Sequence, residues 1–130
     1  MDLERELLKG NTPTLVLAVL REGPLHGYAI AREIERRSDQ ALRCKEGTLY
    51  PALHALEREG LIEGEWREEN GRERKVYLLT PAGHAALVNR TQLWARFSTA
   101  IERVIGPEPD VLVERPGPRL SPGSRPEPAV

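Results

Sequence analysis

The chain has 130 residues, of which 30% are charged and 39% are hydrophobic, so it fits one domain with a small packed core. Its 19 basic and 20 acidic residues give a formal net charge of −1, so the overall composition gives no support for a nucleic-acid partner. One cysteine excludes an intramolecular disulfide, and no apolar run approaches the roughly 20 residues of a membrane-spanning helix. Because the N-terminus also lacks a secretion-signal pattern, we expect a cytoplasmic protein.

The first part of the chain predicts two helices. The pair Thr12-Pro13 is typical of a helix start, with a hydroxyl N-cap before a proline at the first helical position, and Gly23-Pro24 would end that helix. This helix is apolar on nearly all sides, so we expect it to be covered on more than one. A second helix is predicted after Gly27, and we expect His26 to set the turn into it.

The stretch 45–62 predicts a third helix with two different faces. At 100° per residue, one side carries the apolar residues Leu49, Ala52, Leu53 and Leu56. The opposite side carries small, polar and basic residues, namely Gly47, Pro51, His54 and Arg58, with Thr48 and Tyr50 at its edges. Such a face needs no burial and could enter a major groove, and the free N–H groups at the helix start favour a phosphate. The alternative is an ordinary solvated face.

A hairpin is predicted from two strand-like runs, 61–67 and 74–80, around an Asn-Gly turn at 70–71. The tip and return arm carry Arg72, Arg74 and Lys75, which we expect on an exposed loop. A hairpin that lies along DNA needs such cations, because phosphate contacts supply most of the affinity. The alternative is a solubilising turn, since neighbouring glutamates dilute the charge.

The pair Thr80-Pro81 predicts the start of a last, long helix that ends before Gly106-Pro107. Its apolar stripe consists of Leu87, Trp94, Phe97, Ile101 and Val104. Because no other part of the chain is left to cover this stripe, we expect a second copy to do so, with the apolar first helix as the surface that the partner's last helix contacts. Trp94 is interpreted either as dimer core or as the wall of a pocket for a flat aromatic effector between subunits.

The order helix, helix, helix, hairpin, long helix predicts a mainly α fold with a small β-hairpin, a winged helix-turn-helix plus a dimerisation helix. We expect residues 1–80 to bind DNA, 81–106 to form the dimer, and 107–130, which hold seven of the eleven prolines, to be a disordered tail. No glycine-rich phosphate loop, nucleophile elbow or metal motif occurs, so we expect neither an enzyme nor a cofactor.

Three runs carry a specific resemblance: GPLHGYAIAREIE (23–35), EGTLYPALHALEREGLIEGEW (46–66) and GRERKVYLLTPAGHAAL (71–87). Together with the single long helix that follows, they resemble the PadR family of bacterial transcriptional regulators and its short subfamily, over about 10–105. The resemblance implies a dimeric repressor whose winged domains read a palindromic operator. By position, Tyr28, Thr48, Tyr50 and Pro51 match the family's DNA-proximal residues, and Arg72, Arg74 and Lys75 match its wing.

Some positions depart from the family's pattern. Lys45 stands where a serine suited to N-capping is frequent, so the cap is weaker or made by another group, and Lys45 could instead contact a phosphate. Glu73 replaces a frequent proline and Val76 a frequent tyrosine. Cys44 is either an unremarkable thiol or, if its basic neighbours lower its pKa, a redox sensor.

The sequence therefore predicts a DNA-binding transcriptional regulator, a homodimeric repressor released from its operator by a small aromatic effector or another signal. Its partners would be double-stranded operator DNA, a second copy and that effector, with no membrane. The alternative is a winged-helix protein-interaction module without direct DNA binding, which the near-neutral net charge favours.

Overall fold

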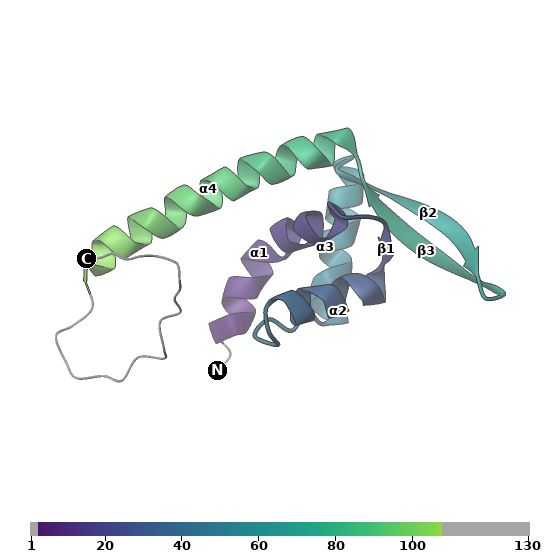
Figure 1. Ribbon diagram of the computed structural model, residues 1–130, viewed down its shortest axis with the longest axis horizontal. Coiled ribbons are helices and arrows are strands. Elements are labelled where there is room, and N and C mark those ends of the chain that lie inside the picture. The colour runs from purple at the N-terminus through teal and green to yellow at the C-terminus, as the bar shows by residue number, and fades with distance from the viewer. Residues whose placement is uncertain (1–2, 108–130) are drawn as a thin grey trace. The chain divides into compact units, whose positions relative to one another are not determined.

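The structure, a computed structural model, describes residues 3–107 and the side chains of residues 8–107. From residue 108 on, the predicted proline-rich tail lies outside the described residues. The elements are α1 (Leu3–Leu20), β1 (Leu25–His26), α2 (Gly27–Arg37), α3 (Glu46–Arg58), β2 (Ile62–Glu69), β3 (Arg72–Leu79) and α4 (Pro81–Ile105), as Figure 1 shows. The boundary between two structural units lies within α4, after Ser98. Between residues 3 and 107, no helix combines the length and apolar content that a bilayer crossing needs.

A single core joins α1, α2, α3 and the sheet, and it confirms the mainly helical winged fold (Figure 1). The buried side chains at its centre are Val16, Leu17, Leu20, Ile30, Ile34, Leu49, Leu53, Leu56, Ile62 and Tyr77. Each fully buried aliphatic side chain contributes roughly 1.5–3 kcal/mol. α1 contacts α2, α3 and β3, so its main apolar side chains are covered within the chain. Leu15 and Ala18 of α1 stay half-buried, and contact of α1 with a partner's last helix stays a prediction.

The start predicted for the first helix is wrong, because α1 already begins at Leu3 and Pro13 lies inside it. Thr12 is fully buried, and its Oγ1 donates a hydrogen bond to the carbonyl oxygen of Leu8 at 2.7 Å, which satisfies the hydroxyl inside the helix. The residues before the pair, LERELLKG, are mostly strong helix formers. That local preference extends the helix through a Thr-Pro pair that would otherwise mark its start.

α2 and α3 form the helix-turn-helix pair, and their starts match the sequence prediction. His26 is the N-cap of α2, and its Nδ1 accepts a hydrogen bond from the backbone N–H of Ala29 at 3.3 Å. Lys45 is the N-cap of α3 and its side chain makes no capping hydrogen bond. Pro51 is six positions into α3 rather than within its first turn, so its missing N–H leaves the exposed Gly47 carbonyl to water.

The hairpin is confirmed, with strands that continue closer to the turn than the predicted runs. β2 pairs with β3 up to Glu69 and Arg72, and the two-residue turn has φ of 52° at Asn70 and 75° at Gly71, as an Asn-Gly turn requires. The antiparallel sheet has the order β1-β3-β2. β1 was not predicted, because two residues carry no periodic pattern.

α4 begins as expected, since the Thr80 Oγ1 accepts a hydrogen bond from the backbone N–H of Gly83 at 3.0 Å. A Cβ at Gly83 would overlap the carbonyl oxygen of Leu61, so this first turn packs directly on the chain between α3 and β2. Leu87 is only 3% exposed and belongs to the core. The prediction that Leu87 lies in a stripe without cover in its own chain is therefore wrong.

Candidate nucleic-acid interface

α3 presents the face that the sequence predicted. Gly47, Pro51, His54 and Arg58 are all exposed, and Thr48 and Tyr50 are half-buried at the edges. The three leucines of the opposite face are at most 1% exposed, so the core fixes the rotation of α3 about its axis. The helix therefore holds small residues and hydrogen-bonding side chains outward on a rigid support, as reading of a major groove requires.

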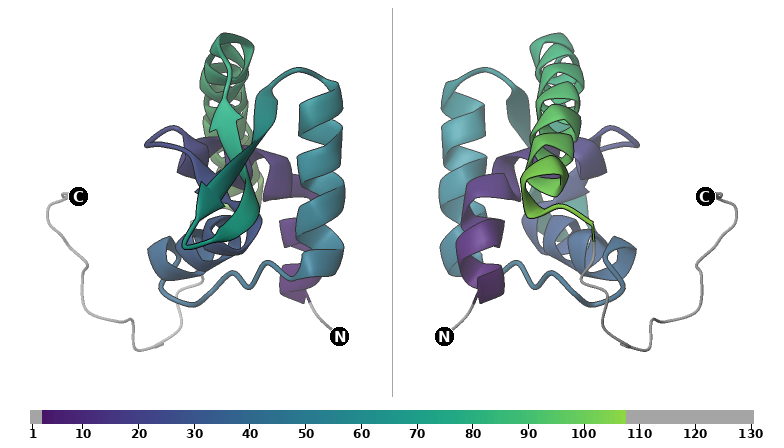
Figure 2. Two further views of the ribbon diagram at one scale, coloured as in Figure 1. Left: turned by 90° about the vertical axis from the view of Figure 1, so that its right-hand side faces the viewer. Right: turned by 90° about the vertical axis from the view of Figure 1, so that its left-hand side faces the viewer.

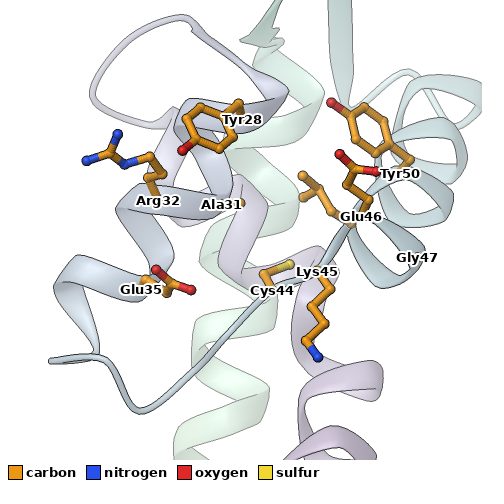
Figure 3. A pocket seen from close by; sticks show the side chains of 10 residues that line it. Tyr28, Ala31, Arg32, Glu35, Cys44, Lys45, Glu46, Gly47 and Tyr50 are labelled. Carbon is orange, nitrogen blue, oxygen red and sulfur yellow. The ribbon is translucent and has the colours of Figure 1, made fainter.

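A pocket of about 640 Å³ lies between α2 and the start of α3, and Figure 3 shows Tyr28 on its α2 side and Tyr50 on its α3 side. Tyr28 is 65% exposed, and the guanidinium of Arg32 lies 5.6 Å from its ring centroid. Lys45, which the sequence offered as a phosphate contact, also lines this pocket. Arg32 was not among the predicted residues, although its place four residues after Tyr28 is a usable signal.

Cys44 lines the same pocket but is only 7% exposed. Burial, and then the neighbouring Glu35 carboxylate, raise the pKa of the Cys44 thiol above its ordinary value. The hypothesis that Arg43 and Lys45 lower this pKa is therefore wrong. A thiol with a raised pKa forms little thiolate at neutral pH, which removes the support for redox sensing.

The register of the wing, the β2–β3 hairpin, separates its cations onto two faces. Paired residues of antiparallel strands share a face, so the pairs Arg67–Arg74 and Glu69–Arg72 place three arginines together. Lys75 pairs with Trp66 and projects from the other face. Arg67 was missed because its face follows from the register and not from its place in the sequence.

The expectation that all three predicted wing cations lie on an exposed loop is wrong for two of them. Arg72 is exposed beside the turn, whereas Arg74 and Lys75 are half-buried on β3. The Lys75 Nζ lies 3.4 Å from Glu57 Oε1 on α3. The Arg74 Nη1 lies 2.8 Å from His26 Nε2 on β1. Arg72 is thus the predicted wing cation with the freest access to a duplex.

A second pocket, of about 340 Å³, lies where β1, β3 and the two helices meet, and we call it the tyrosine pocket. Its lining consists of His26, Gly27, Tyr28, Tyr50, Arg74, Lys75 and Tyr77. Figure 2, left, shows the hairpin with α3 beside it and α2 below. A Cβ at Gly27 would lie 2.5 Å from the Tyr50 hydroxyl oxygen, so Tyr50 packs on the start of α2. Burial, and then the charge of Glu57, raise the pKa of Tyr77.

The remaining residues of the predicted stripe on α4 are exposed. In the unit that ends at Ser98, Trp94 is 52% and Phe97 is 57% exposed, and their ring centroids are 6.0 Å apart. In the unit that begins at Thr99, Ile101 and Val104 are also exposed. Large apolar side chains at successive helical turns need cover, which is consistent with their predicted role at an interface between copies.

Comparison with known proteins agrees with this geometry. The model of the transcriptional regulator PadR-like family matches residues 16–89, which include α2, α3 and the whole wing. The chain is 40% identical over 83 residues to the transcriptional regulator Rv3488 of Mycobacterium tuberculosis, covering 64% of this chain and 75% of that protein. Both the helix-turn-helix and the wing are therefore features that the chain shares with its relatives.

Two solved structures resemble the fold. A transcriptional regulator from Clostridium thermocellum superposes with a TM-score of 0.72 at 30% identity, over 78% of this chain and 99% of that chain. A PadR family transcriptional regulator from Eggerthella lenta superposes with a TM-score of 0.67 at 31% identity, over 77% of this chain and 86% of that chain. The predicted resemblance is confirmed, and so is the expectation of a regulator rather than an enzyme: the chain belongs to the PadR-like family of transcriptional regulators.

Proposed function

We propose that the chain is a homodimeric, sequence-specific transcriptional repressor that acts in the cytoplasm. In this proposal residues 1–80 bind DNA and α4 forms the dimer. Two α3 helices enter successive major grooves of a palindromic operator and present Thr48, Tyr50, Pro51, His54 and Arg58. Tyr28, Lys45 and Gly47 meet the backbone beside each groove, together with the wing residues Arg72, Arg74 and Lys75.

The observation that carries this proposal is the outward face of α3, which three buried leucines hold in place. At its edge, Tyr50 lines one pocket together with Tyr28 of α2 and with Arg74 and Lys75 of the wing. An amphipathic surface helix has no need of an exposed glycine and proline within its reading face, but close approach to base edges favours small residues there. Arg58 and His54 add hydrogen-bond donors on the same face. Family membership adds independent support.

Repression would be relieved by a change in the distance between the two α3 helices. Paired half-sites demand a fixed spacing, so a ligand that favours another dimer geometry would release the DNA. Trp94 and Phe97 supply aromatic surface for a flat effector between the subunits, and the same residues would otherwise form dimer core. Fluorescence of the tryptophans would report entry of such an effector.

The test of sequence reading is a binding assay on duplexes tiled across the DNA upstream of the protein's own gene, with scrambled duplexes of equal length as reference. His54→Ala should reduce the preference for the best duplex by about tenfold, since one lost base contact costs roughly 1–3 kcal/mol. His84→Ala, an exposed histidine on α4, is the matched control and should bind like the wild type. If the wild type binds all duplexes equally, the protein does not recognise a DNA sequence and the proposed sequence-specific function is wrong.

A further inference from the structure

The tyrosine pocket gathers hydrogen-bonding groups that the protein itself leaves unused. The hydroxyls of Tyr28, Tyr50 and Tyr77 come from three different elements, α2, α3 and β3. Within residues 8–107, none of these hydroxyls has a hydrogen-bond partner in the protein. Tyr28 is exposed, Tyr50 is half-buried and Tyr77 is buried, and polar groups that lack protein partners are satisfied by water or by a ligand. Three donors on one small concave surface therefore favour an acceptor-rich ligand.

His26 and Arg74 make conflicting demands on one imidazole ring at the edge of this pocket. The His26 Nδ1 accepts from the Ala29 N–H, so it carries no proton in that arrangement. A neutral ring must then carry its proton on Nε2, which points at the Arg74 Nη1 only 2.8 Å away. Guanidinium nitrogens only donate, so two donors face each other. In this tautomer, an oxyanion bound beside the two nitrogens would accept from both once they move apart, and so remove the conflict.

The charges that line the tyrosine pocket also favour an anion. Arg74 and Lys75 supply positive charge, and no Asp or Glu is among its lining residues. Glu57 neutralises part of the Lys75 charge, which leaves Arg74 as the principal cation. The pocket between α2 and α3, by contrast, includes the carboxylates of Glu35 and Glu46 beside its basic residues. Of these two pockets, the tyrosine pocket is therefore the better host for an anion.

Its position connects the two DNA-contacting parts of the proposed function. The pocket opens where β1 ends after only two pairs, so β3 has no β1 partner opposite Arg74 and Lys75. The α2 N-terminus, with its favourable dipole for anions, forms one wall through Gly27 and Tyr28. Tyr50 brings in the edge of the α3 reading face. A group bound here would lie between the reading helix and the wing.

We infer that the tyrosine pocket binds a phosphate group, a backbone phosphodiester of the duplex that α3 reads, through Arg74, His26 Nε2 and the tyrosine hydroxyls. This inference rests on the proposed function and adds to it a defined phosphate site. His26, assigned by sequence only to the turn, thereby gains a second role. A free phosphate or phosphorylated small molecule offers the same oxygens, so the experiment must separate the two sources.

The experiment replaces single phosphates of the best duplex by uncharged methylphosphonates, one position at a time, and measures binding of wild type and Arg74→Gln. In the wild type, one position per half-site should weaken binding by about tenfold, since a charge-assisted hydrogen bond contributes roughly 1.5–3 kcal/mol. Arg74→Gln should weaken binding to the unmodified duplex by a similar factor. A methylphosphonate at that same position should then cause no further loss of affinity in this variant. Arg67→Gln, an arginine on the same face that is bonded to Glu65, is the matched control and should keep the full sensitivity.

A second variant tests the same site if Arg74→Gln fails to fold. Tyr28→Phe removes only a hydroxyl from an exposed ring and should reduce sensitivity at the same phosphate position, with unchanged circular dichroism. A titration with inorganic phosphate, followed by the NMR signals of the His26 ring, tests the other source. The backbone assignment would be overturned in favour of a small-anion site by two results together: His26 signals that shift at millimolar phosphate, and no methylphosphonate position whose effect disappears in Arg74→Gln.

Two further outcomes separate this inference from the proposed function. If the wild type binds the duplex but Arg74→Gln keeps the full sensitivity to methylphosphonates at every position, the assignment of the pocket is wrong while DNA binding stands. If the wild type binds no duplex above background, the proposed function fails and the phosphate site fails with it.

Discussion

Glu33 shows how a single side chain on α2 fixes the helix–turn region without taking part in the site. Its carboxylate accepts hydrogen bonds from Arg36 at 2.6 Å and from Arg37 at 2.8 Å, and Arg37 also pairs with Glu22 at 3.0 Å. These hydrogen bonds, Arg36 first, lower the pKa of Glu33 to about 2. They keep two arginines on the surface of the last turn of α2, where cations also suit the helix dipole.

The lowered pKa predicts an acid-dependent contribution of Glu33 to stability. A carboxyl group whose folded-state pKa lies below its unfolded value stabilises the protein above the unfolded pKa and loses that effect as pH falls through the folded pKa. Glu33→Gln should therefore melt below the wild type at pH 6, and the two melting temperatures should converge between about pH 4.5 and pH 2. The Glu63→Gln variant, altered at an exposed position on β2, should follow the wild type throughout. A constant difference at all pH values would argue against the ion pairs.

Cys44 gives a second prediction at this scale. Burial and the raised thiol pKa both slow alkylation, so the native protein should react with iodoacetamide at pH 7.5 at least tenfold more slowly than the urea-unfolded chain. Mass spectrometry of quenched samples measures both rates. Native labelling as fast as that of the unfolded chain would restore the reactive-thiol hypothesis.

At the scale of elements, the close contact between α2 and α3 depends on Gly27. Alanine would favour the helix by about 1 kcal/mol on intrinsic grounds, but its Cβ would lie 2.5 Å from the Tyr50 hydroxyl oxygen. Overpacking of this kind costs roughly 1–3 kcal/mol. The sequence pattern HGY identified a helix start here, whereas the need for a glycine became visible only with the Tyr50 contact.

We therefore expect Gly27→Ala to lower the melting temperature and to weaken DNA binding by displacing Tyr50 from the tyrosine pocket. Tyr50→Phe, which lacks the hydroxyl, should partly restore the stability of Gly27→Ala, and the two substitutions should be non-additive. Thermal melts of the four proteins measure this coupling. Additive effects would show that α2 and α3 absorb the methyl group elsewhere.

Most of the fold could be predicted because its signals are local. The leucine spacing gave the buried face of α3, and Asn70-Gly71 gave the hairpin turn. The site was less accessible to sequence reasoning because it depends on register and long-range contacts. The separation of Arg74 from Lys75 follows from their place in the paired strand β3, and the contact of Arg74 with His26 joins residues that lie 48 positions apart in the chain. The Thr12-Pro13 error arose because the same pair can start a helix or lie inside one.

At the scale of the whole molecule, the near-neutral net charge of −1 hides a local excess of arginine on one face of the wing. On the wing, the register gathers Arg67, Arg72 and Arg74 on one face together with Glu65 and Glu69, and it places the pair Glu68–Glu73 on the other face with Lys75. Binding to a polyanion depends on local potential rather than on total charge, so a balanced composition does not argue against DNA. The net charge that favoured a protein-interaction module is thus compatible with a regulator.

The proposed dimerisation through α4 predicts a large effect of one aromatic residue. Loss of a buried tryptophan costs roughly 3–5 kcal/mol, so Trp94→Ala should weaken the dimer by about 100-fold or more. Trp66→Ala removes the other tryptophan, which is 66% exposed on β2, and should leave the dimer intact. Sedimentation velocity over a range of concentrations gives both dissociation constants. A Trp94→Ala dimer as tight as the wild type would remove Trp94 from the interface.

In the proposed function the wing and α3 act together on a duplex, and one measurement tests this most directly. Binding of the best upstream duplex is measured by anisotropy at several salt concentrations for wild type, Arg72→Gln and, as control, Glu73→Gln. The wild-type affinity should fall steeply with salt, and Arg72→Gln should bind more weakly with a slope of log affinity against log salt that is flatter by about 1. Glu73→Gln should show no flattening. A wild-type affinity independent of salt, or an Arg72→Gln slope equal to that of the wild type, would contradict the proposed interface.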